Sequence, residues 1–140
     1  MNAPRTVLVV DDEDQLLRLM AQVIERSGGE ALTARTGDDA RRIFQERSAE
    51  IGIVLLDITM PGGDGAQELM PEFLAERPDL SVIITSGNPL PPDLEAELQK
   101  VGGQFLQKPF VPKALIRVLE ESVSASGATD STLPPAAGIV

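Results

Sequence analysis

The chain has 140 residues, which suits one domain with an ordinary, here mainly aliphatic, hydrophobic core. Its formal net charge of −10 at pH 7 argues against a nucleic-acid-binding surface, because neutralising phosphates requires clustered Lys and Arg. The chain contains no histidine, which excludes Ser-His-Asp triads and His-ligated zinc or haem, so any histidine chemistry must come from a partner.

Short apolar runs alternate with amphipathic segments in the first half of the chain. The expected elements are, in order, a strand at 7–10, a helix at 14–27, a strand at 31–34, a helix at 36–47 and a strand at 51–56. Gly28-Gly29 is typical of a helix end, and Thr36 is placed to cap the second helix. This half therefore predicts strands that are each followed by a helix.

The same alternation continues in the second half. The expected elements are a helix at 66–77, a strand at 80–85, a helix at 93–101, a strand at 105–107 and a helix at 112–123. Pro71 lies well inside the first of these helices, where it predicts a kink or a late helix start. Five strands alternating with five helices predict an α/β domain whose parallel sheet is covered on both faces.

The most informative position is Asp57, which ends the unbroken apolar run 53–56. A carboxylate inside a strand buried on both faces has a large desolvation cost, so we expect Asp57 just past the carboxyl end of the strand. The first strand is followed in the same way by Asp11, Asp12 and Glu13. Ligands bind at this edge of open parallel sheets, and the gathered carboxylates would repel one another without a cation. The pattern predicts a divalent-metal site with a spare aspartate.

Four short motifs carry a resemblance to a known family. They are Val9-Val10-Asp11-Asp12-Glu13, the segment LLDITMPGGDG at 55–65, Ile83-Ile84-Thr85-Ser86-Gly87 and Lys108-Pro109-Phe110. In this order, at the ends of the first, third, fourth and fifth strands, they resemble the receiver domain of two-component response regulators. The resemblance implies a single-domain flavodoxin-like (βα)5 fold over 1–123, with the sheet order 2-1-3-4-5. Residues 124–140, which are rich in Ser, Ala, Gly and Pro, are predicted to be a flexible tail.

The resemblance implies that Asp57 is the phosphoacceptor. The phosphoryl donor would be a phosphohistidine on a sensor histidine kinase or a histidine phosphotransfer protein. The implied cofactor is Mg²⁺ or Mn²⁺, held by Asp12, Asp57 and the backbone carbonyl of Thr59, with Asp11 acting largely through a metal-bound water. Lys108 would pair with Asp57 before transfer and with the phosphoryl oxygens after it.

Two adjacent hydroxyls compete for one role in the fourth strand. Strand alternation sends Thr85 and Ser86 to opposite faces, so one of them can reach the phosphoryl group. The resemblance favours Ser86 as the switch hydroxyl and implies that Phe105 is an aromatic side chain that rotates on phosphorylation. It also places Thr59 and Asn88 at positions that tune the lifetime of the phosphoryl group.

Three further features accompany the resemblance. It implies a cis peptide bond between Lys108 and Pro109. Asp64-Gly65 is best explained by turn geometry rather than by a role in the site. The chain departs from the family pattern at Pro71 and in the proline-rich loop 88–92, which leads into the helix through which many receivers signal.

The expected output is binding to a protein. By resemblance, the surface lies on the fourth helix, fifth strand and fifth helix around Leu94, Leu98, Phe105 and Leu106, and it would take an unknown downstream protein or a second copy of the chain. Neither nucleic acid nor a membrane is an expected partner. We expect no enzymatic activity beyond the chain's own phosphotransfer and autodephosphorylation. A cytoplasmic location is expected, because cysteine, a signal-peptide pattern and a membrane-spanning apolar run are all missing.

Several alternatives stay open or are disfavoured at this stage. Since no DNA-binding segment follows the receiver, the chain is expected to be a stand-alone receiver or a phosphorelay intermediate. An interaction-only pseudo-receiver is disfavoured by the complete set of site residues. An aspartyl-phosphate phosphatase fits less well, because the context after Asp11-Asp12-Glu13-Asp14 differs from its Asp-x-Asp motif. A flavin-binding module lacks its phosphate loop after Val10, and an EF-hand lacks its central glycine.

Overall fold

Strands and helices alternate along the chain in the computed structural model, which describes residues 6–60 and 63–128. The strands are β1 (Thr6–Val10), β2 (Glu30–Ala34), β3 (Ile51–Asp57), β4 (Ser81–Ser86) and β5 (Gln104–Gln107). The helices are α1 (Asp14–Arg26), α2 (Gly37–Arg47), α3 (Ala66–Glu76), α4 (Pro92–Lys100) and α5 (Pro112–Ala128). The predicted elements are all present, and their ends differ from the prediction by one residue at most, except at the end of α5.

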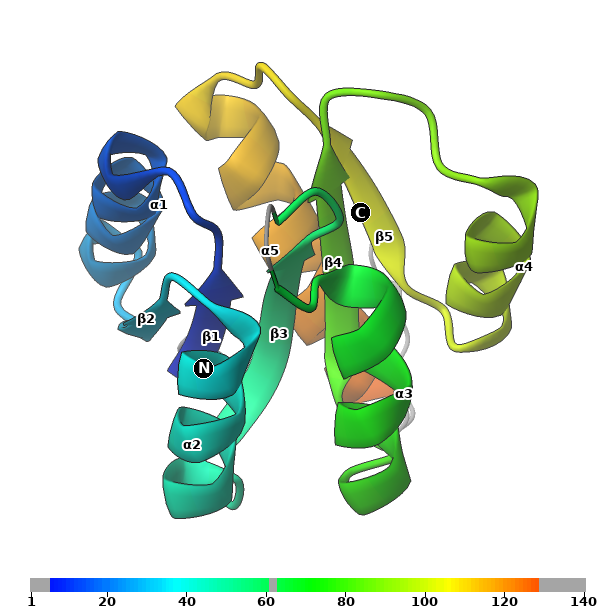
Figure 1. The fold of residues 1–140 in the computed structure, drawn as a ribbon. Coiled ribbons are helices and arrows are strands. Elements are labelled where there is room, and N and C mark those ends of the chain that lie inside the picture. Colours follow the sequence, from blue (N-terminus) through cyan, green and yellow to red (C-terminus); the bar gives the residue numbers. More distant parts are fainter. Residues whose placement is uncertain (1–5, 61–62, 129–140) are drawn as a thin grey trace.

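All four strand pairs are parallel, and the strand order is β2-β1-β3-β4-β5, which confirms the predicted fold class. Figure 1 shows α2, α3 and α4 on one face of the sheet and α1 and α5 on the other, in agreement with the two separate apolar cores. Consecutive strands are linked by helices, so the carboxyl ends of all five strands lie along one edge.

The middle strand β3 is buried over its whole length. Its side chains alternate between the two cores: Val54 and Leu56 pack toward α2 and α3, whereas Ile53 and Leu55 pack toward α1 and α5. Each large aliphatic side chain buried in this way contributes about 1.5–3 kcal/mol to stability. The central position of β3 therefore fixes the place where its last residue, Asp57, meets the edge.

Local signals account for most helix ends. The Thr36 hydroxyl accepts a hydrogen bond from the Asp39 N–H at 3.0 Å, as predicted for the cap of α2. Gly102 follows α4 with a φ of 68°, a conformation that favours glycine. Of the two outcomes predicted at Pro71, the late start is wrong, because α3 begins at Ala66, and the kink stays a prediction. Pro71 is exposed, as is Gln67, whose carbonyl loses its helical donor, so water can replace the missing bond.

The last helix runs further than predicted. α5 continues to Ala128, whereas the sequence predicted its end at residue 123 and a tail from Ser124 onward. Alanine favours the helix, and the next proline after the helix start is Pro134, so no local signal stops α5 at the predicted boundary. The rest of the predicted tail, 129–140, lies outside the described residues. No helix in the described part of the chain is long and apolar enough to cross a membrane.

Candidate functional site

Two aspartates lie side by side where β1 and β3 reach the edge of the sheet. Asp11 follows β1 directly, and Asp57 is the last residue of β3, where it pairs in register with Thr85 of β4. Their exposed fractions are 0% and 2%. The prediction that Asp57 lies just past the strand was therefore wrong by one residue. Its backbone extends the ladder while its side chain projects at the edge, so the strand gains a pair without enclosing the carboxylate in the apolar core.

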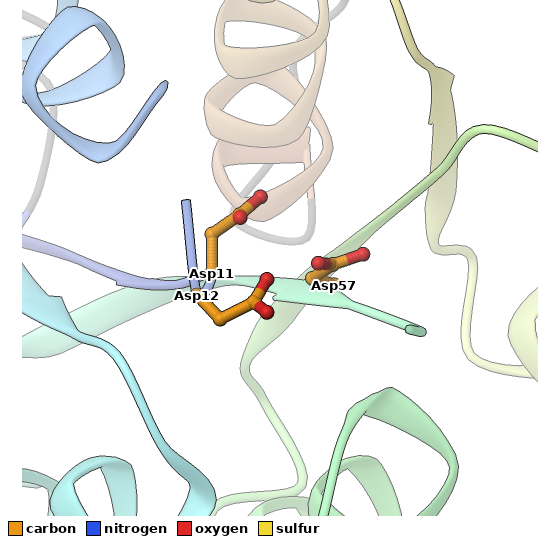
Figure 2. A group of neighbouring side chains, drawn as sticks. All are labelled: Asp11, Asp12 and Asp57. Atoms are coloured by element: carbon orange, nitrogen blue, oxygen red, sulfur yellow. The ribbon is translucent and has the colours of Figure 1, made fainter. Parts of the chain in front are cut away.

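Asp11, Asp12 and Asp57 form an acidic cluster. Each offers one carboxylate oxygen, and these three oxygens all lie within 4.8 Å of one another. Figure 2 shows the three side chains gathered at the ends of β1 and β3, with Asp12 directed toward Asp57. Three carboxylate oxygens at this spacing fit a hard divalent cation such as Mg²⁺ or Mn²⁺, which takes oxygen ligands.

Lys108 directly follows β5, an outer strand of the sheet, and brings a positive charge to the acidic cluster. Its Nζ lies 2.9 Å from Asp11 Oδ2 and 3.3 Å from Asp57 Oδ2. The Lys108 backbone N–H donates to the Ser86 carbonyl at 2.8 Å, which attaches the end of β5 to the end of β4. The Lys108-Pro109 bond is cis, and this prediction is confirmed. The sequence thus placed Lys108 correctly at the edge that holds both aspartates.

Burial and charge shift the protonation of these groups. Burial raises the pKa of Asp57 to about 6, and the nearby charge of Asp11 acts in the same direction. The Lys108 ammonium and the Thr59 N–H, which donates to Asp57 Oδ1 at 3.2 Å, oppose that rise without cancelling it. Burial lowers the pKa of Lys108, but the carboxylates of Asp11 and Asp57 outweigh it, and the net shift is upward. The edge therefore keeps a negative excess that favours a further cation.

The two candidate switch hydroxyls have different surroundings. Ser86 lies on the face of the sheet that carries Ile84, and its Oγ accepts a hydrogen bond from the Asn88 N–H at 3.0 Å. Thr85 lies on the opposite face with Ile83, beside Asp57 in the register. Its Oγ1 is buried and has no hydrogen-bond partner among the described residues. The predicted opposition of the two side chains is present, and the choice of Ser86 stays a prediction.

Phe105 lies away from the carboxylates, on β5. It is partly buried against the core formed with α2, α3 and α4. It lines a cavity of about 300 Å³ together with Leu90, Leu98 and Gly103. This cavity gives the ring a place on the α4 side of β5, where the sequence predicted the output surface.

The sequence missed one further contact of Lys108. Its Nζ lies 3.3 Å from Glu13 Oε1, so the ammonium is shared by three carboxylates. Glu13 was recognised as part of the acidic run after the first strand, but no pattern indicated that it faces Lys108. The Glu13 N–H also donates to Asp11 Oδ1 at 2.9 Å, which ties Glu13 locally to the buried aspartate.

The comparisons with known proteins agree with this geometry. The family model of the response regulator receiver domain matches residues 7–120. The chain is 32% identical over 111 residues to the transcriptional regulatory protein CssR of Bacillus subtilis, covering 79% of this chain and 48% of that protein. It is 34% identical over 119 residues to the C4-dicarboxylate transport transcriptional regulatory protein DctD of Pseudomonas aeruginosa, covering 82% and 24%. The chain thus spans about half or less of these relatives.

Solved structures show the same fold. A response regulator receiver domain protein from Clostridium thermocellum matches with a TM-score of 0.78 at 27% identity, covering 89% of this chain and 98% of that one. NtrX from Brucella abortus, solved in complex with ATP, matches with a TM-score of 0.79 at 29% identity, covering 90% and 28%. With a family model that covers most of its length and the site motifs at the carboxyl edge of the sheet, the chain belongs to the receiver domains of two-component response regulators.

Proposed function

We propose that this receiver accepts a phosphoryl group on Asp57 from a sensor histidine kinase or a histidine phosphotransfer protein, in a reaction that needs Mg²⁺ or Mn²⁺. The observation that carries the proposal is the setting of Asp57. Its carboxylate belongs to a three-aspartate cluster and also lies 3.3 Å from the Lys108 ammonium. A nucleophile beside an ammonium group and within a set of carboxylates that could hold a cation suits phosphoryl transfer, because the transition state spreads negative charge over the transferred oxygens.

The proposed step converts one phosphoryl linkage into another. A carboxylate oxygen of Asp57 bonds to phosphorus, while the bond between phosphorus and the partner's imidazole nitrogen breaks and leaves its electron pair on that nitrogen. Asp57 must be ionised to attack, and with a pKa of about 6 it is mainly ionised at neutral pH. A divalent cation bound by the acidic cluster would neutralise charge on the transferred group.

The remaining residues receive supporting roles. The Lys108 ammonium already contacts Asp57 and would pair with the phosphoryl oxygens after transfer. By resemblance the Ser86 hydroxyl would bond the phosphoryl group and release the Asn88 N–H. The register places Thr85 on the face of the sheet that carries Asp57, so Thr85 is the competing candidate. Phe105 would respond by moving within its cavity, and the Thr59 carbonyl would complete the cation's ligands. Thr59 and Asn88 also carry exposed side chains, which suits positions that set the phosphoryl lifetime.

The proposed output is a phosphorylation-dependent contact with another protein, or with a second copy, on the surface of α4, β5 and α5. We propose no enzymatic activity beyond the chain's own phosphorylation and dephosphorylation, and we place the protein in the cytoplasm. The cavity lined by Leu98 and Phe105 supports this surface, because it offers apolar area next to the charged Glu95 and two glutamines.

Incubation with acetyl phosphate and MgCl₂ tests the proposal directly. Intact mass should show one added phosphate on the wild-type chain and none when EDTA replaces MgCl₂. Asp57→Ala should abolish the addition, whereas Asp93→Ala, which removes an exposed carboxylate on α4, should leave it unchanged. An undiminished yield in Asp57→Ala would show that the phosphoacceptor lies elsewhere.

A further inference from the structure

Arg41 of α2 is the centre of a second set of ion pairs, outside the acidic cluster. Its guanidinium contacts Glu72 of α3 with Nε at 2.7 Å and Nη2 at 2.8 Å, so this pair is bidentate. Nη2 also lies 2.6 Å from Asp64 Oδ2, and Nη1 lies 3.2 Å from Asp38 Oδ1. One side chain therefore links α2, α3 and the segment that connects β3 to α3.

Asp64 is part of the segment that begins directly after Asp57. Gly37, at the start of α2, packs so closely on this segment that a Cβ there would lie 2.8 Å from the Asp64 carbonyl oxygen. Gly65 packs in the same way on the site, since its Cβ would lie 2.8 Å from the carbonyl oxygens of Asp57 and Ile58. Backbone therefore stacks on backbone from α2 through Asp64 and Gly65 to the proposed phosphoacceptor.

The start of this segment is fixed separately. The Ile58 N–H donates to the Thr85 carbonyl at 3.0 Å, and the Thr59 N–H donates to Asp57 Oδ1 at 3.2 Å. These bonds hold the segment at its β3 end, whereas the Arg41 side chain holds it at its α3 end. Thr59, whose carbonyl is the proposed backbone ligand, lies between the two attachments.

The Arg41 contacts differ from ordinary surface ion pairs. Exposed pairs contribute little unless the geometry is bidentate or several charges form a network, and both conditions hold here. The Arg41 side chain is 28% exposed, and its hydrogen bonds to Glu72 and Asp64 raise its pKa, so it stays charged. A planar guanidinium can hold both carboxylates in one geometry, whereas a lysine ammonium would act as a point charge.

We propose that Arg41 is a positioning residue for the phosphorylation site. By holding Asp64 and Glu72 together, it keeps the β3–α3 connection packed against the backbone of Asp57. The consequence is a defined place for the Thr59 carbonyl at the cation site. This inference rests on the proposed function of the acidic cluster, but it assigns a role to a side chain on the outer surface of α2.

The test uses three variants of the full chain. Arg41→Gln removes the charge, Arg41→Lys keeps it without the bidentate fork, and Arg42→Gln is the matched control. Arg42 is the next residue on α2, and its guanidinium lies 3.5 Å from Asp39 on the same helix, without an ion pair to the described residues of the β3–α3 connection. Two properties are measured: the Mg²⁺ dissociation constant by calorimetric titration, and amide hydrogen exchange of residues 57–65 without metal.

Arg41→Gln should weaken Mg²⁺ binding by about three- to tenfold, which is below the loss seen when a direct neighbour of a metal ligand is removed. It should also speed hydrogen exchange at 57–65 in the metal-free protein. Arg41→Lys should lie between Arg41→Gln and the wild type, and Arg42→Gln should match the wild type. Asp64→Asn should reproduce the Arg41→Gln effect, and the double variant should add little to either single change.

Two results would overturn the proposal. One is a Mg²⁺ affinity of Arg41→Gln that stays within about twofold of the wild type, with unchanged exchange at 57–65. The other is an equal loss in Arg42→Gln, which would indicate a general effect of charge on α2. If the wild type itself fails to bind Mg²⁺, the proposed function is wrong, and the metal-free exchange measurement alone then decides the role of Arg41.

Discussion

Two clusters in this molecule contain the same charges in different surroundings. The Lys108 cluster comprises Lys108 with Asp11, Glu13 and Asp57, and the Arg41 cluster comprises Arg41 with Asp38, Asp64 and Glu72. Each has one cation and three carboxylates. In the first, the side chains of Asp11 and Asp57 are 0% and 3% exposed, whereas in the second those of Asp64 and Glu72 are 44% and 49% exposed.

In the buried cluster, the effect of burial on the carboxylate pKa outweighs the effect of the shared cation. In the Arg41 cluster the hydrogen bond from Arg41 lowers the pKa of Glu72, as expected for a carboxylate with a cationic partner. In the Lys108 cluster the pKa of Asp57 rises to about 6 even though Lys108 lies 3.3 Å away. In the exposed cluster, Arg41 is therefore enough to favour the ionised form of Glu72. In the buried cluster, Lys108 does not offset the cost of ionising Asp57. This difference supports the proposed cation site at the edge of the sheet rather than one at the Arg41 cluster.

The largest difference should appear when the shared cation is removed from each cluster. Lys108→Met should lower the free energy of unfolding at pH 7 by about 3 kcal/mol, because Asp11 and Asp57 then stay buried without a partner. Arg41→Gln should cost less, about 1 kcal/mol, because the network is bidentate but its partners Asp64 and Glu72 are nearly half exposed and can be solvated by water. Urea denaturation of both variants measures the two values. Equal losses would mean that burial does not set the clusters apart.

A second comparison replaces one carboxylate in each cluster. The folded-state pKa of Asp57 is about 6 against an ordinary value of 3.8, so the folded state binds more protons between these pH values and stability falls as pH rises through them. Asp57→Asn should remove that fall. Removing the shift corresponds to a stabilisation of about 3 kcal/mol at most. We expect a smaller gain of about 2 kcal/mol at pH 7, because the substitution also removes one partner of Lys108.

The matched change at the surface should have the opposite sign. The pKa of Glu72 is lowered in the folded state, so its contribution is present at neutral pH and is lost as pH falls through the folded pKa. Glu72→Gln should therefore destabilise slightly at pH 7 and make no difference in acid. Denaturation midpoints from about pH 2 to pH 8 for both variants provide the measurement. A loss of stability in Asp57→Asn at pH 7 would contradict the raised pKa of Asp57.

Added Mg²⁺ should stabilise the folded chain through the acidic cluster and not through the Arg41 cluster, by less than the substitutions at Lys108 and Asp57 change stability. A cation at ten times its dissociation constant stabilises the folded chain by about 1.4 kcal/mol and raises the thermal midpoint by a few degrees. The rise should disappear in Asp12→Ala, which removes one ligand of the acidic cluster, and should persist in Asp38→Ala of the Arg41 cluster. A rise that survives in Asp12→Ala would place the cation at another site.

The Lys108 cluster was largely predictable from sequence, and the Arg41 cluster was not. Asp11 and Asp57 each follow an apolar run, Lys108 was placed by the family motif, and the carboxyl ends of parallel strands meet at one edge whatever the side chains do. Arg41 and Asp64 are separated by 23 residues in the chain and belong to a helix surface and a connection. Their contact depends on side-chain direction and on the close approach of Gly37, which no local pattern encodes.

The errors in the fold have similar causes. Asp57 was placed outside β3 because its side chain needs solvation, yet its backbone can extend the ladder. Pro71 suggested a late helix start, but its place on an exposed face of α3 leaves the unpaired carbonyl accessible to water. The end of α5 was set too early because composition alone indicated a tail. The strand order came from the family resemblance, since the alternation of elements permits several orders.

The smallest predicted effect concerns a buried polar group that carries no charge, the Thr85 hydroxyl. Thr85 lies beside Asp57 in the register, and its buried hydroxyl has no hydrogen-bond partner among the described residues. Thr85→Val keeps the shape and removes this polar group, so it should stabilise the protein by about 1 kcal/mol. Ser86→Ala is the matched change on the neighbouring residue, and it should destabilise slightly, because the Asn88 N–H loses its acceptor.

Urea denaturation and acetyl phosphate labelling of both hydroxyl variants complete this test. Labelling of Asp57 should stay largely intact in each, because neither hydroxyl attacks phosphorus. Chemical shifts around Phe105 should respond to a phosphoryl mimic in Thr85→Val and should respond weakly in Ser86→Ala. If Thr85→Val instead destabilises the chain and loses that response, then Thr85 is the switch hydroxyl. In that case a neutral hydroxyl, as well as the Lys108 ammonium, would influence the response to phosphorylation of Asp57.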